Sequence, residues 1–490
     1  MKQAIFFLYL IVSCFFCSCQ SLPENPELSN ELPCIIPDYT GVTIPASIAP
    51  LNFWMADVDC MDVFVEGSKG GKLHVNGTYS DFDIEEWHDV INQNVGDSIL
   101  ITVCALRDGH WTKYRSFPVF ISEDPIDEWG VIYRLIPPGY ESYGQMGIYQ
   151  RNLSNFEQTS IIDNFDIDGQ CINCHTPNLT NPDNFTLHVR GKYGATIVKV
   201  GENLDVLEAK NEILGGSMVY PFWHPSGRYI AYSTNQTRQN FHQLKDLRVE
   251  VYDEKSDVVI YNTSTHQLVL DSIVAKKDRL ENYPVFSPDG KSLFFCDAQI
   301  VDSVWKNYRD IKYNICKVGF DPVSGDFDGN VDIVVDACSV GKSAVMPRIS
   351  YDGKFLLYTI CDYGCFPIWH PEADLWMKDL ETGVSFPLVK ANSTDSESFH
   401  NWSKNSKWIV FTSRRDDGLY TRLYFAHIGS DGQADKAFCL PQRNPQEYYA
   451  ETIWSFNTPE FASSPINLDR GSICRKILSG ERKKTTVSSE

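Results

Sequence analysis

Two cysteines and a histidine stand at a spacing that can do chemistry. Cys171 and Cys174 are three residues apart and His175 follows directly, in the order Cys-x-x-Cys-His. Two thiols on one helical turn can add to the two vinyl groups of a haem, and the adjacent imidazole can then ligate the iron. We therefore predict one covalent haem c, attached through Cys171 and Cys174, with His175 as an axial ligand.

Three other interpretations of this motif remain open. A structural zinc needs a second pair of ligands, and the only candidates, Cys361 and Cys365 with His370, have a different spacing. A thioredoxin-like redox pair needs a βαβ setting, whereas turn-forming residues flank this segment. A plain disulfide is the third alternative, although cysteines this close on a helical turn do not readily form one.

The second axial position of the predicted haem has two candidate ligands. Met146 and His188 flank the motif on either side in the sequence. A methionine ligand raises the potential of a haem, a histidine lowers it, and an empty position permits substrate chemistry. For each residue the alternative is ordinary core packing or a hydrogen bond within the protein.

The first residues predict export. Lys2 precedes an apolar run over residues 4–16, and Ser18 stands before Cys19. The run is too short for a membrane span but has the length of a signal-peptide core. Residues 16–19 resemble a bacterial lipobox, with Phe16 where leucine is usual. We predict a signal peptide over 1–18 and a lipid on Cys19, with a plain signal peptide as the alternative. The expected location is the periplasmic side or the cell surface of a Gram-negative membrane.

The charge balance limits the partners. The 43 Lys and Arg residues against 64 Asp and Glu residues give a net charge of −21. Such an excess of negative charge repels phosphate backbones and anionic lipid faces. We therefore expect no nucleic-acid partner, and membrane contact only through the N-terminal lipid.

A repeated unit defines the architecture. Four segments, which begin at Tyr220, Tyr283, Met346 and Phe399, each contain a hydrophobic strand, a tight turn and a second strand. The shared turn position is occupied by Gly227, Gly290, Gly353 and Ser406, at spacings of 63, 63 and 53 residues. Hairpins at this period are typical of propeller blades, because a single blade cannot bury both of its faces. We predict six blades, with seven as the alternative.

The remaining segments complete an all-β organisation. We expect a lipid-anchored linker over 19–32, an Ig-like β-sandwich over 33–135, and a haem-binding insertion with the first propeller strands over 136–186. The propeller itself is expected over 187–461 and a flexible tail over 462–490.

The hairpin units resemble the PD40 (WD40-like) repeats of TolB-type propellers, in which a Ser-Pro-Asp-Gly turn and a basic residue, here residues 287–291, join two blade strands. With the lipobox and the Cys-x-x-Cys-His motif, most of residues 33–461 resembles a group of bacterial lipoproteins described as TolB-like or cytochrome-c-type proteins. The resemblance implies the propeller. The partners of TolB itself do not transfer, because TolB has no haem.

The function expected from these features is electron transfer or redox sensing through one haem. The expected partner is a redox protein or another periplasmic or outer-membrane protein. One alternative is a non-enzymatic propeller scaffold that binds a protein or glycan, and another is a haem-dependent oxidoreductase with its substrate in the propeller funnel. A hydrolase is disfavoured because the chain has no Gly-x-Ser-x-Gly motif, and no residue is predicted to be catalytic.

Overall fold

The computed structural model describes residues 23, 25–138, 144–208, 214–244 and 247–487. The predicted signal peptide and Cys19 lie outside these residues. The chain forms two compact units. The first comprises the described residues of 1–41, 50–121 and 442–450, and the second comprises the described residues of 42–49, 122–441 and 451–490.

The first unit is built on one main sheet and a helix. Its strands run in the order β1-β8-β7-β5-β6, with β9 also paired to β7. Their bounds are β1 Glu27–Leu28, β5 Cys60–Gly67, β6 Lys72–Gly77, β7 Ser98–Arg107, β8 His110–Lys113 and β9 Phe117–Ile121. A short pair, β2 (Ile35–Ile36) and β4 (Trp54–Met55), a helix, α2 (Ile84–Gln93), and most of a second helix, α4 (Pro445–Glu451), also belong to the unit.

Helix α2 makes the first unit different from the predicted β-sandwich. Asp83 caps α2 by accepting hydrogen bonds from the backbone of Glu85 and Glu86. Trp87, Val90 and Ile91 are buried at helical spacing. A single large sheet and this helix therefore replace the two packed sheets, and the prediction missed the helix because it relied on the strand-like runs on either side.

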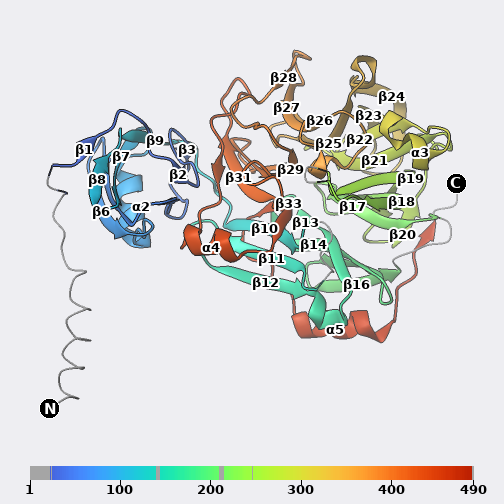
Figure 1. Ribbon diagram of the computed structural model, residues 1–490. Helices are drawn as coiled ribbons and strands as arrows, with labels where there is room; N and C mark the ends of the chain where they lie inside the picture. The colour runs from blue at the N-terminus through green and yellow to red at the C-terminus, as the bar shows by residue number, and fades with distance from the viewer. Residues whose placement is uncertain (1–22, 24, 139–143, 209–213, 245–246, 488–490) are drawn as a thin grey trace. The chain divides into compact units, whose positions relative to one another are not determined.

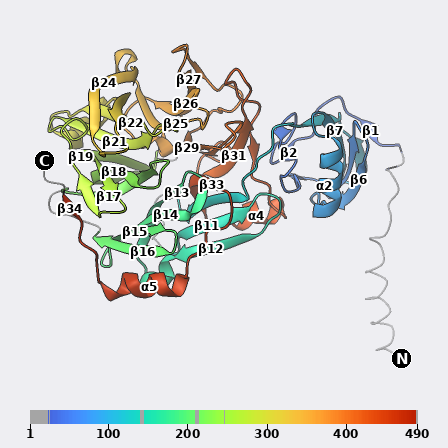
Figure 2. The same ribbon diagram turned by 180° about the vertical axis from the view of Figure 1, so that it is seen from behind.

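The second unit contains a six-bladed β-propeller (Figures 1 and 2). Each blade is an antiparallel sheet of four strands. Blade 1 contains β33 Ser455–Ala462, β10 Gly130–Ile136, β11 Gly147–Asn152 and β12 Gln158–Asp163; blade 2 contains β13 Cys171–Asn178, β14 Asn181–Arg190, β15 Ala195–Val200 and β16 Asn203–Glu208; blade 3 contains β17 Ser217–Trp223, β18 Tyr229–Phe241, β19 Val249–Asn262 and β20 Gln267–Val269.

The other three blades follow the same order along the chain. Blade 4 contains β21 Arg279–Phe286, β22 Ser292–Gln299, β23 Tyr313–Phe320 and β24 Phe327–Val335; blade 5 contains β25 Ser343–Ile349, β26 Phe355–Cys361, β27 Asp374–Asp379 and β28 Ser385–Pro387; blade 6 contains β29 Glu397–Trp402, β30 Trp408–Ser413, β31 Arg422–His427 and β32 Phe438–Cys439. The prediction of six blades is thus confirmed. The first strand of each blade lies nearest the centre of the ring (Figure 1).

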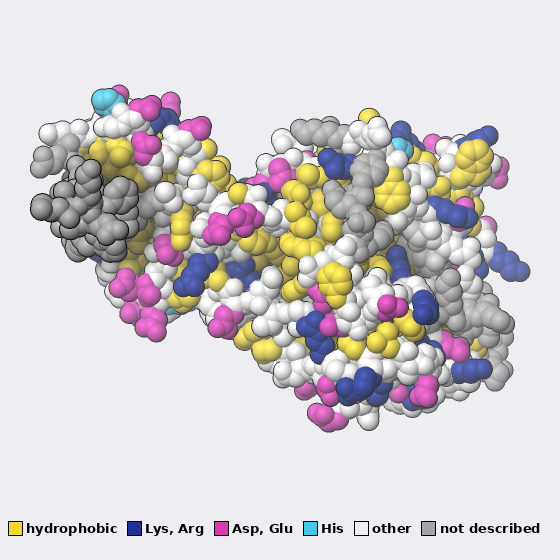
Figure 3. Space-filling model, turned by 60° about the horizontal axis from the view of Figure 1, so that its bottom comes forward, with side chains coloured by type: hydrophobic (Ala, Val, Ile, Leu, Met, Phe, Trp, Pro, Cys, Tyr) yellow, Lys and Arg dark blue, Asp and Glu magenta, His cyan; other side chains and the backbone are white. Residues whose placement is uncertain are grey.

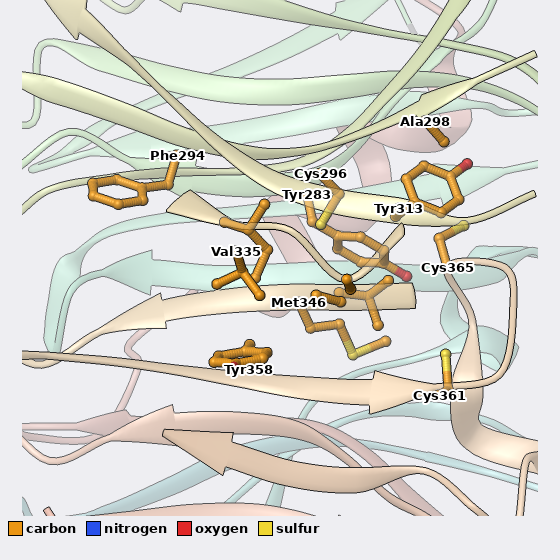
Figure 4. Close-up of a cluster of buried hydrophobic side chains, with 14 of the residues drawn as sticks. Tyr283, Phe294, Cys296, Ala298, Tyr313, Val335, Met346, Tyr358, Cys361 and Cys365 are labelled. Carbon is orange, nitrogen blue, oxygen red and sulfur yellow. The ribbon is translucent and has the colours of Figure 1, made fainter. Parts of the chain in front are cut away.

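Strands from both ends of the propeller sequence close the ring. In blade 1, β33 pairs antiparallel with β10, more than 300 residues earlier in the chain. Buried side chains fill the spaces between the blades. Figure 4 shows one such cluster between blades 4 and 5, which includes Tyr283, Cys296, Tyr313, Met346 and Tyr358.

The predicted turns have the expected conformation. Gly227, Gly290 and Gly353 have φ angles of 72°, 70° and 77°, and Ser406 at the fourth position has a φ of 61°. This left-handed region favours glycine, which three of the four turns have.

A bulge recurs in the innermost strand of every blade. At each bulge the strand register shifts. A non-glycine residue with a φ between 46° and 56° stands at each of these points, namely Cys174, Tyr220, Tyr283, Met346, Phe399 and Thr458. Such angles are uncommon for these residue types, and bulges of this kind change the direction in which side chains point. The six bulges therefore mark one repeated position around the axis.

The haem-motif segment is part of this repeat. Cys171–Asn178 forms β13, the innermost strand of blade 2. It is therefore neither a helical turn nor an insertion, and both expectations were wrong. The repeat was not recognised in this segment because its residues differ from those of the other blades. Cys174 and His175 occupy the bulge, whereas three other blades have an aromatic or methionine residue followed by proline there.

The C-terminal segment 462–490, predicted as a flexible tail, packs against the propeller. Helix α5 (Arg470–Ser479) buries Ile473, Cys474 and Ile477 in a cluster with residues of blades 1 and 2. Beyond it, Arg482 donates to the carbonyls of Tyr193 and Gly194, and β34 (Thr486–Val487) pairs with β20. Arg482 thus binds blade 2, and this part of the chain is not a free tail. None of the helices in the described residues has the length and apolar character needed to cross a membrane.

Candidate functional site in the propeller channel

A channel follows the axis of the propeller. Its central cavity has a volume of about 940 Å³, including the part open to solvent. All six bulge residues line it. A second cavity shares Arg134, Arg190 and Gln239 with the first, and a third shares Arg348 and Glu460. We call them the central, outer and inner cavities of the channel.

The strand β13 places the three motif residues along this channel. Cys171 lines the outer cavity, and Cys174 and His175 line the central one. In a regular strand, residues three apart point to opposite faces. The bulge at Cys174 breaks this alternation, so both thiols border the channel. Both cysteines are free thiols. The structure therefore brings together the three residues that the sequence singled out.

His175 is buried without a hydrogen-bond partner for its ring. The residue is 1% exposed, and neither Nδ1 nor Nε2 has a partner of good geometry among the described residues. Burial, which outweighs a weak opposing effect of the Ile132 carbonyl, lowers the pKa of His175 to about 3. The imidazole is therefore neutral, the form that binds metals.

The equivalent histidine of blade 6 differs in this respect. His400 follows the bulge residue Phe399, as His175 follows Cys174. His400 is also buried, but its Nε2 donates a hydrogen bond to the carbonyl of Leu357 at 3.2 Å. His400 is thus satisfied by the fold, whereas His175 has two unpaired nitrogens beside a cavity.

The two predicted second ligands lie in different places. Arg134 Nη2 is 3.4 Å from both Cys171 Sγ and Met146 Sδ, so Met146 is close to the motif, although it is buried and lines no part of the channel. His188 Nδ1 is 3.0 Å from Thr196 Oγ1, and His188 borders a separate cavity. Neither residue shares the central cavity with His175.

Several channel residues were missed in the sequence. Three arginines, one carboxylate, two tyrosines and one methionine line the central cavity: Arg134, Arg190, Arg348, Glu460, Tyr220, Tyr283 and Met346. Three of these residues could have been predicted to share a location, because Tyr220, Tyr283 and Met346 occupy one position of the repeat, just before a proline. The sequence pattern does not mark the three arginines as channel residues, because their position near the axis depends on how the strands pair.

A buried ion pair separates the central and inner cavities. Arg348 Nη2 is 3.9 Å from Glu460 Oε1, and Asn401 donates to the other oxygen of Glu460. Burial raises the pKa of Glu460 to about 7, despite the favourable charge of Arg348. Burial also lowers the pKa of Arg348. Both groups line the central and inner cavities, so their charges act on anything bound there.

Other conspicuous histidines serve the fold. His224 Nε2 donates to the carbonyl of Gly290 at 3.0 Å. His370 Nε2 is 3.1 Å from Glu250 Oε1. In the described part of the chain, no group of three or more His, Cys, Asp or Glu side chains is arranged to hold a metal ion. The charged turn after β30 is an ion-paired loop, in which Arg415 lies 3.0 Å from Glu397.

No family model matches this chain. No curated protein matches its sequence either. Similar solved structures include prolyl oligopeptidase B from Galerina marginata, with a TM-score of 0.36, 11% identity, and coverage of 62% of this chain and 44% of that chain. Native arabinanase Arb43A of Bacillus subtilis has a TM-score of 0.32, 10% identity, and coverage of 53% and 98%.

An ancestral GH74 enzyme gives a TM-score of 0.35 and 8% identity over 64% of this chain and 38% of its own. This chain therefore spans less than half the length of the oligopeptidase and of the GH74 enzyme. Similarity at this level carries no information about the ligand, substrate or partner of this chain. The propeller architecture rests on its own strand pairing.

Proposed function

We propose that this protein is an exported, lipid-anchored c-type cytochrome-like propeller that transfers electrons or senses redox state through one haem in its channel. The single observation that carries the proposal is the placement of Cys171, Cys174 and His175 along one channel, with both thiols free and the buried imidazole lacking a partner. A buried polar group without a partner is unfavourable by about 1–3 kcal/mol, so such groups call for an explanation.

The donor set fits a haem. Cys171 and Cys174 supply the two thiols, and each forms a thioether by adding its S–H across one vinyl group. His175 supplies the neutral imidazole. The outer cavity adds apolar walls suited to a porphyrin, formed by Ile136, Pro137, Val251, Phe366 and Trp369. The strand conformation of the motif differs from the helical turn expected for such sites, so attachment relies on the bulge at Cys174.

The channel would tune the potential of the bound group. A haem supplies one-electron redox chemistry. Arg134 and Arg190 border both the central and outer cavities. Positive charge near an iron centre stabilises its reduced state, while apolar walls exclude water. The propeller positions these groups and provides a rigid surface on which a redox partner can dock.

Three residues are candidates for a second ligand of the iron. Met146 and His188 were the candidates from sequence, and neither lines the central cavity. Met346, the bulge residue of blade 5, lines the same cavity as His175. Replacing Met146, His188 and Met346 singly by alanine identifies the ligand, because only its loss shifts the absorption spectrum of the reduced protein.

Export and lipid attachment belong to the same proposal. The supporting observations are the apolar run 4–16 and Cys19, which lie outside the described residues. Haem c is attached outside the cytoplasm in bacteria, so export and the motif are consistent with each other. Metabolic labelling with a radioactive fatty acid tests the anchor, and the label must disappear in Cys19→Ala.

Haem staining of a denaturing gel tests the central proposal. The protein is produced in a host with the c-type maturation system, and the wild-type band should retain haem. Cys171→Ala and Cys174→Ala together should abolish staining, whereas Cys34→Ala, which removes an exposed cysteine of the first unit, should leave it unchanged. An unstained wild-type band contradicts the proposal.

One observation favours the alternative of a scaffold without haem. His175 stands where the other blades place ordinary packing residues, including His400. If the wild-type protein folds, is exported and carries no haem, the channel residues are structural and the protein is a propeller that binds a protein or glycan. The staining experiment therefore separates the two functions.

A further inference from the structure

We propose that the central cavity, when no haem occupies it, binds a small organic carboxylate through Arg348 and Tyr283. The observation behind this proposal is a group of buried polar atoms without partners that converge on one cavity. It does not rest on the cysteines or on His175.

Unpaired donors point to the ligand. Arg348 Nε and Tyr283 Oη are buried and have no hydrogen-bond partner among the described residues, and Arg134 Nε is in the same situation. All three residues line the central cavity, and Tyr283 is only 4% exposed. Each atom is a donor at neutral pH, because the pKa of Tyr283 is raised well above its ordinary value by burial. Buried donors normally have acceptors, so a bound acceptor is expected here.

The charge of the cavity selects an anion. Three arginines line it, against a single carboxylate, Glu460. Burial raises the pKa of Glu460, which weakens the negative charge of this carboxylate relative to the arginines. The chain as a whole carries a net charge of −21, and Figure 3 shows acidic and basic side chains interspersed on one face. A positive interior in an acidic protein attracts an anion to the channel.

The walls select an organic anion over an inorganic one. The rings of Tyr220 and Tyr283 lie 4.3 Å apart, and those of Phe366 and Phe399 lie 6.0 Å apart. All four line the central cavity. Arg348 Nε and Tyr283 Oη can each donate a hydrogen bond to a carboxylate, and the aromatic rings then contact an apolar or ring-bearing body.

Titration calorimetry with benzoate tests the proposal. The full chain is used with Cys171→Ala and Cys174→Ala, so that no haem occupies the channel. Benzoate should bind at one site with a Kd of about 1 mM or tighter. Benzyl alcohol, which lacks the charge, and inorganic phosphate, which lacks the apolar body, should each bind at least tenfold more weakly, a difference of about 1.4 kcal/mol.

Two variants assign the binding residues. Tyr283→Phe removes only a hydroxyl that makes no hydrogen bond of good geometry among the described residues, and benzoate affinity should fall about fivefold to tenfold, as for one lost hydrogen bond. Arg348→Gln should reduce affinity more strongly. The control is Arg238→Gln, between two channel residues on β18, because Arg238 is 63% exposed and pairs with Glu254 at 2.9 Å. The control should bind benzoate as the parent protein does.

The results separate this inference from the proposed function. Benzoate that binds no more tightly than benzyl alcohol, or equally well to the parent, Tyr283→Phe and Arg348→Gln proteins, overturns the carboxylate site. Phosphate that binds more tightly than benzoate overturns it in favour of an inorganic anion site. Haem staining of the protein with intact cysteines reports on the redox function independently, so each proposal can fail alone.

Discussion

His175 and His400 occupy equivalent positions in two blades but have different surroundings. The ring of His400 donates to Leu357, whereas neither nitrogen of His175 has a partner of good geometry among the described residues. If a histidine makes a hydrogen bond within the protein, replacing it by an apolar residue removes that bond and lowers stability. If the histidine instead awaits a ligand, the ligand-free protein loses no hydrogen bond. Replacing each histidine by an apolar residue therefore tests whether His175 serves the fold or a ligand.

The comparison gives a stability prediction for the haem-free chain. In the background of Cys171→Ala and Cys174→Ala, His400→Leu should lower the free energy of unfolding by about 1–3 kcal/mol, because the buried hydrogen bond from His400 Nε2 to the Leu357 carbonyl is lost. His175→Leu should change it by less than about 1 kcal/mol. Urea unfolding followed by tryptophan fluorescence measures both. Equal losses would show that His175 is a packing residue like His400.

Glu281 gives the protein a predicted pH dependence. This residue of β21 is fully buried, and burial raises its pKa to about 8 from an ordinary value of 4.5. The folded state therefore holds a proton that the unfolded state releases between pH 4.5 and 8. Stability should fall as pH rises through this window, by about 1.4 kcal/mol for each unit of effective pKa shift.

Replacing the carboxyl by an amide tests this prediction. Glu281→Gln should show a weaker loss of stability than the wild type between pH 5 and pH 8, because its side chain cannot ionise. Thermal unfolding of both proteins across this range measures the difference. Parallel curves for the two proteins would contradict the raised pKa of Glu281.

At the scale of elements, the sequence predicted the repeat but not the bulges. The hairpins at Gly227, Gly290 and Gly353 were visible because their turns need a residue that tolerates a positive φ. The bulges at Cys174 and Tyr220 depend on which strands pair, and no local pattern records that pairing. This is why the motif was found by residue type but was expected on a helical turn.

The C-terminal helix shows the same limit. The partners of Arg482, just beyond the helix, are the carbonyls of residues 193 and 194, which lie far away in the sequence. The isoleucines at 473 and 477 are one helical turn apart and both are buried. The helix therefore stabilises blades 1 and 2, with which its cluster is shared.

Two substitutions in α5 test this role. Ile473→Ala should lower the free energy of unfolding by about 2–5 kcal/mol, because it leaves a cavity in the cluster between the helix and the blades. Leu478→Ala, on the same helix at a position 38% exposed, should cost less than about 1 kcal/mol. Chemical denaturation compares the two, and a small effect of Ile473→Ala would mean that the helix is not part of the folded core.

At the scale of the molecule, the ring depends on its last strand. Blade 1 contains β33 next to β10, so the propeller closes only after residue 462 has been made. The sequence predicted six blades or seven, and the structure has six because the strand after β32 returns to the first blade instead of starting another.

Two truncated chains test this closure. A chain that ends at Trp454 lacks β33 and should lose cooperative unfolding, because β10 and the six-bladed core are left open. A chain that ends at Asp469 keeps β33 and lacks α5, and it should still unfold cooperatively at a lower temperature. Circular dichroism melting curves compare them. A cooperative transition in the shorter chain would show that the ring closes without β33.

The mass of the intact protein tests the proposed redox function most directly. After production with the c-type maturation system, the denatured wild-type chain should be heavier than its polypeptide and lipid by one haem, and the added mass should be absent from the protein with Cys171→Ala and Cys174→Ala. A wild-type mass that matches the polypeptide and lipid alone, together with no Soret absorption, would contradict the account.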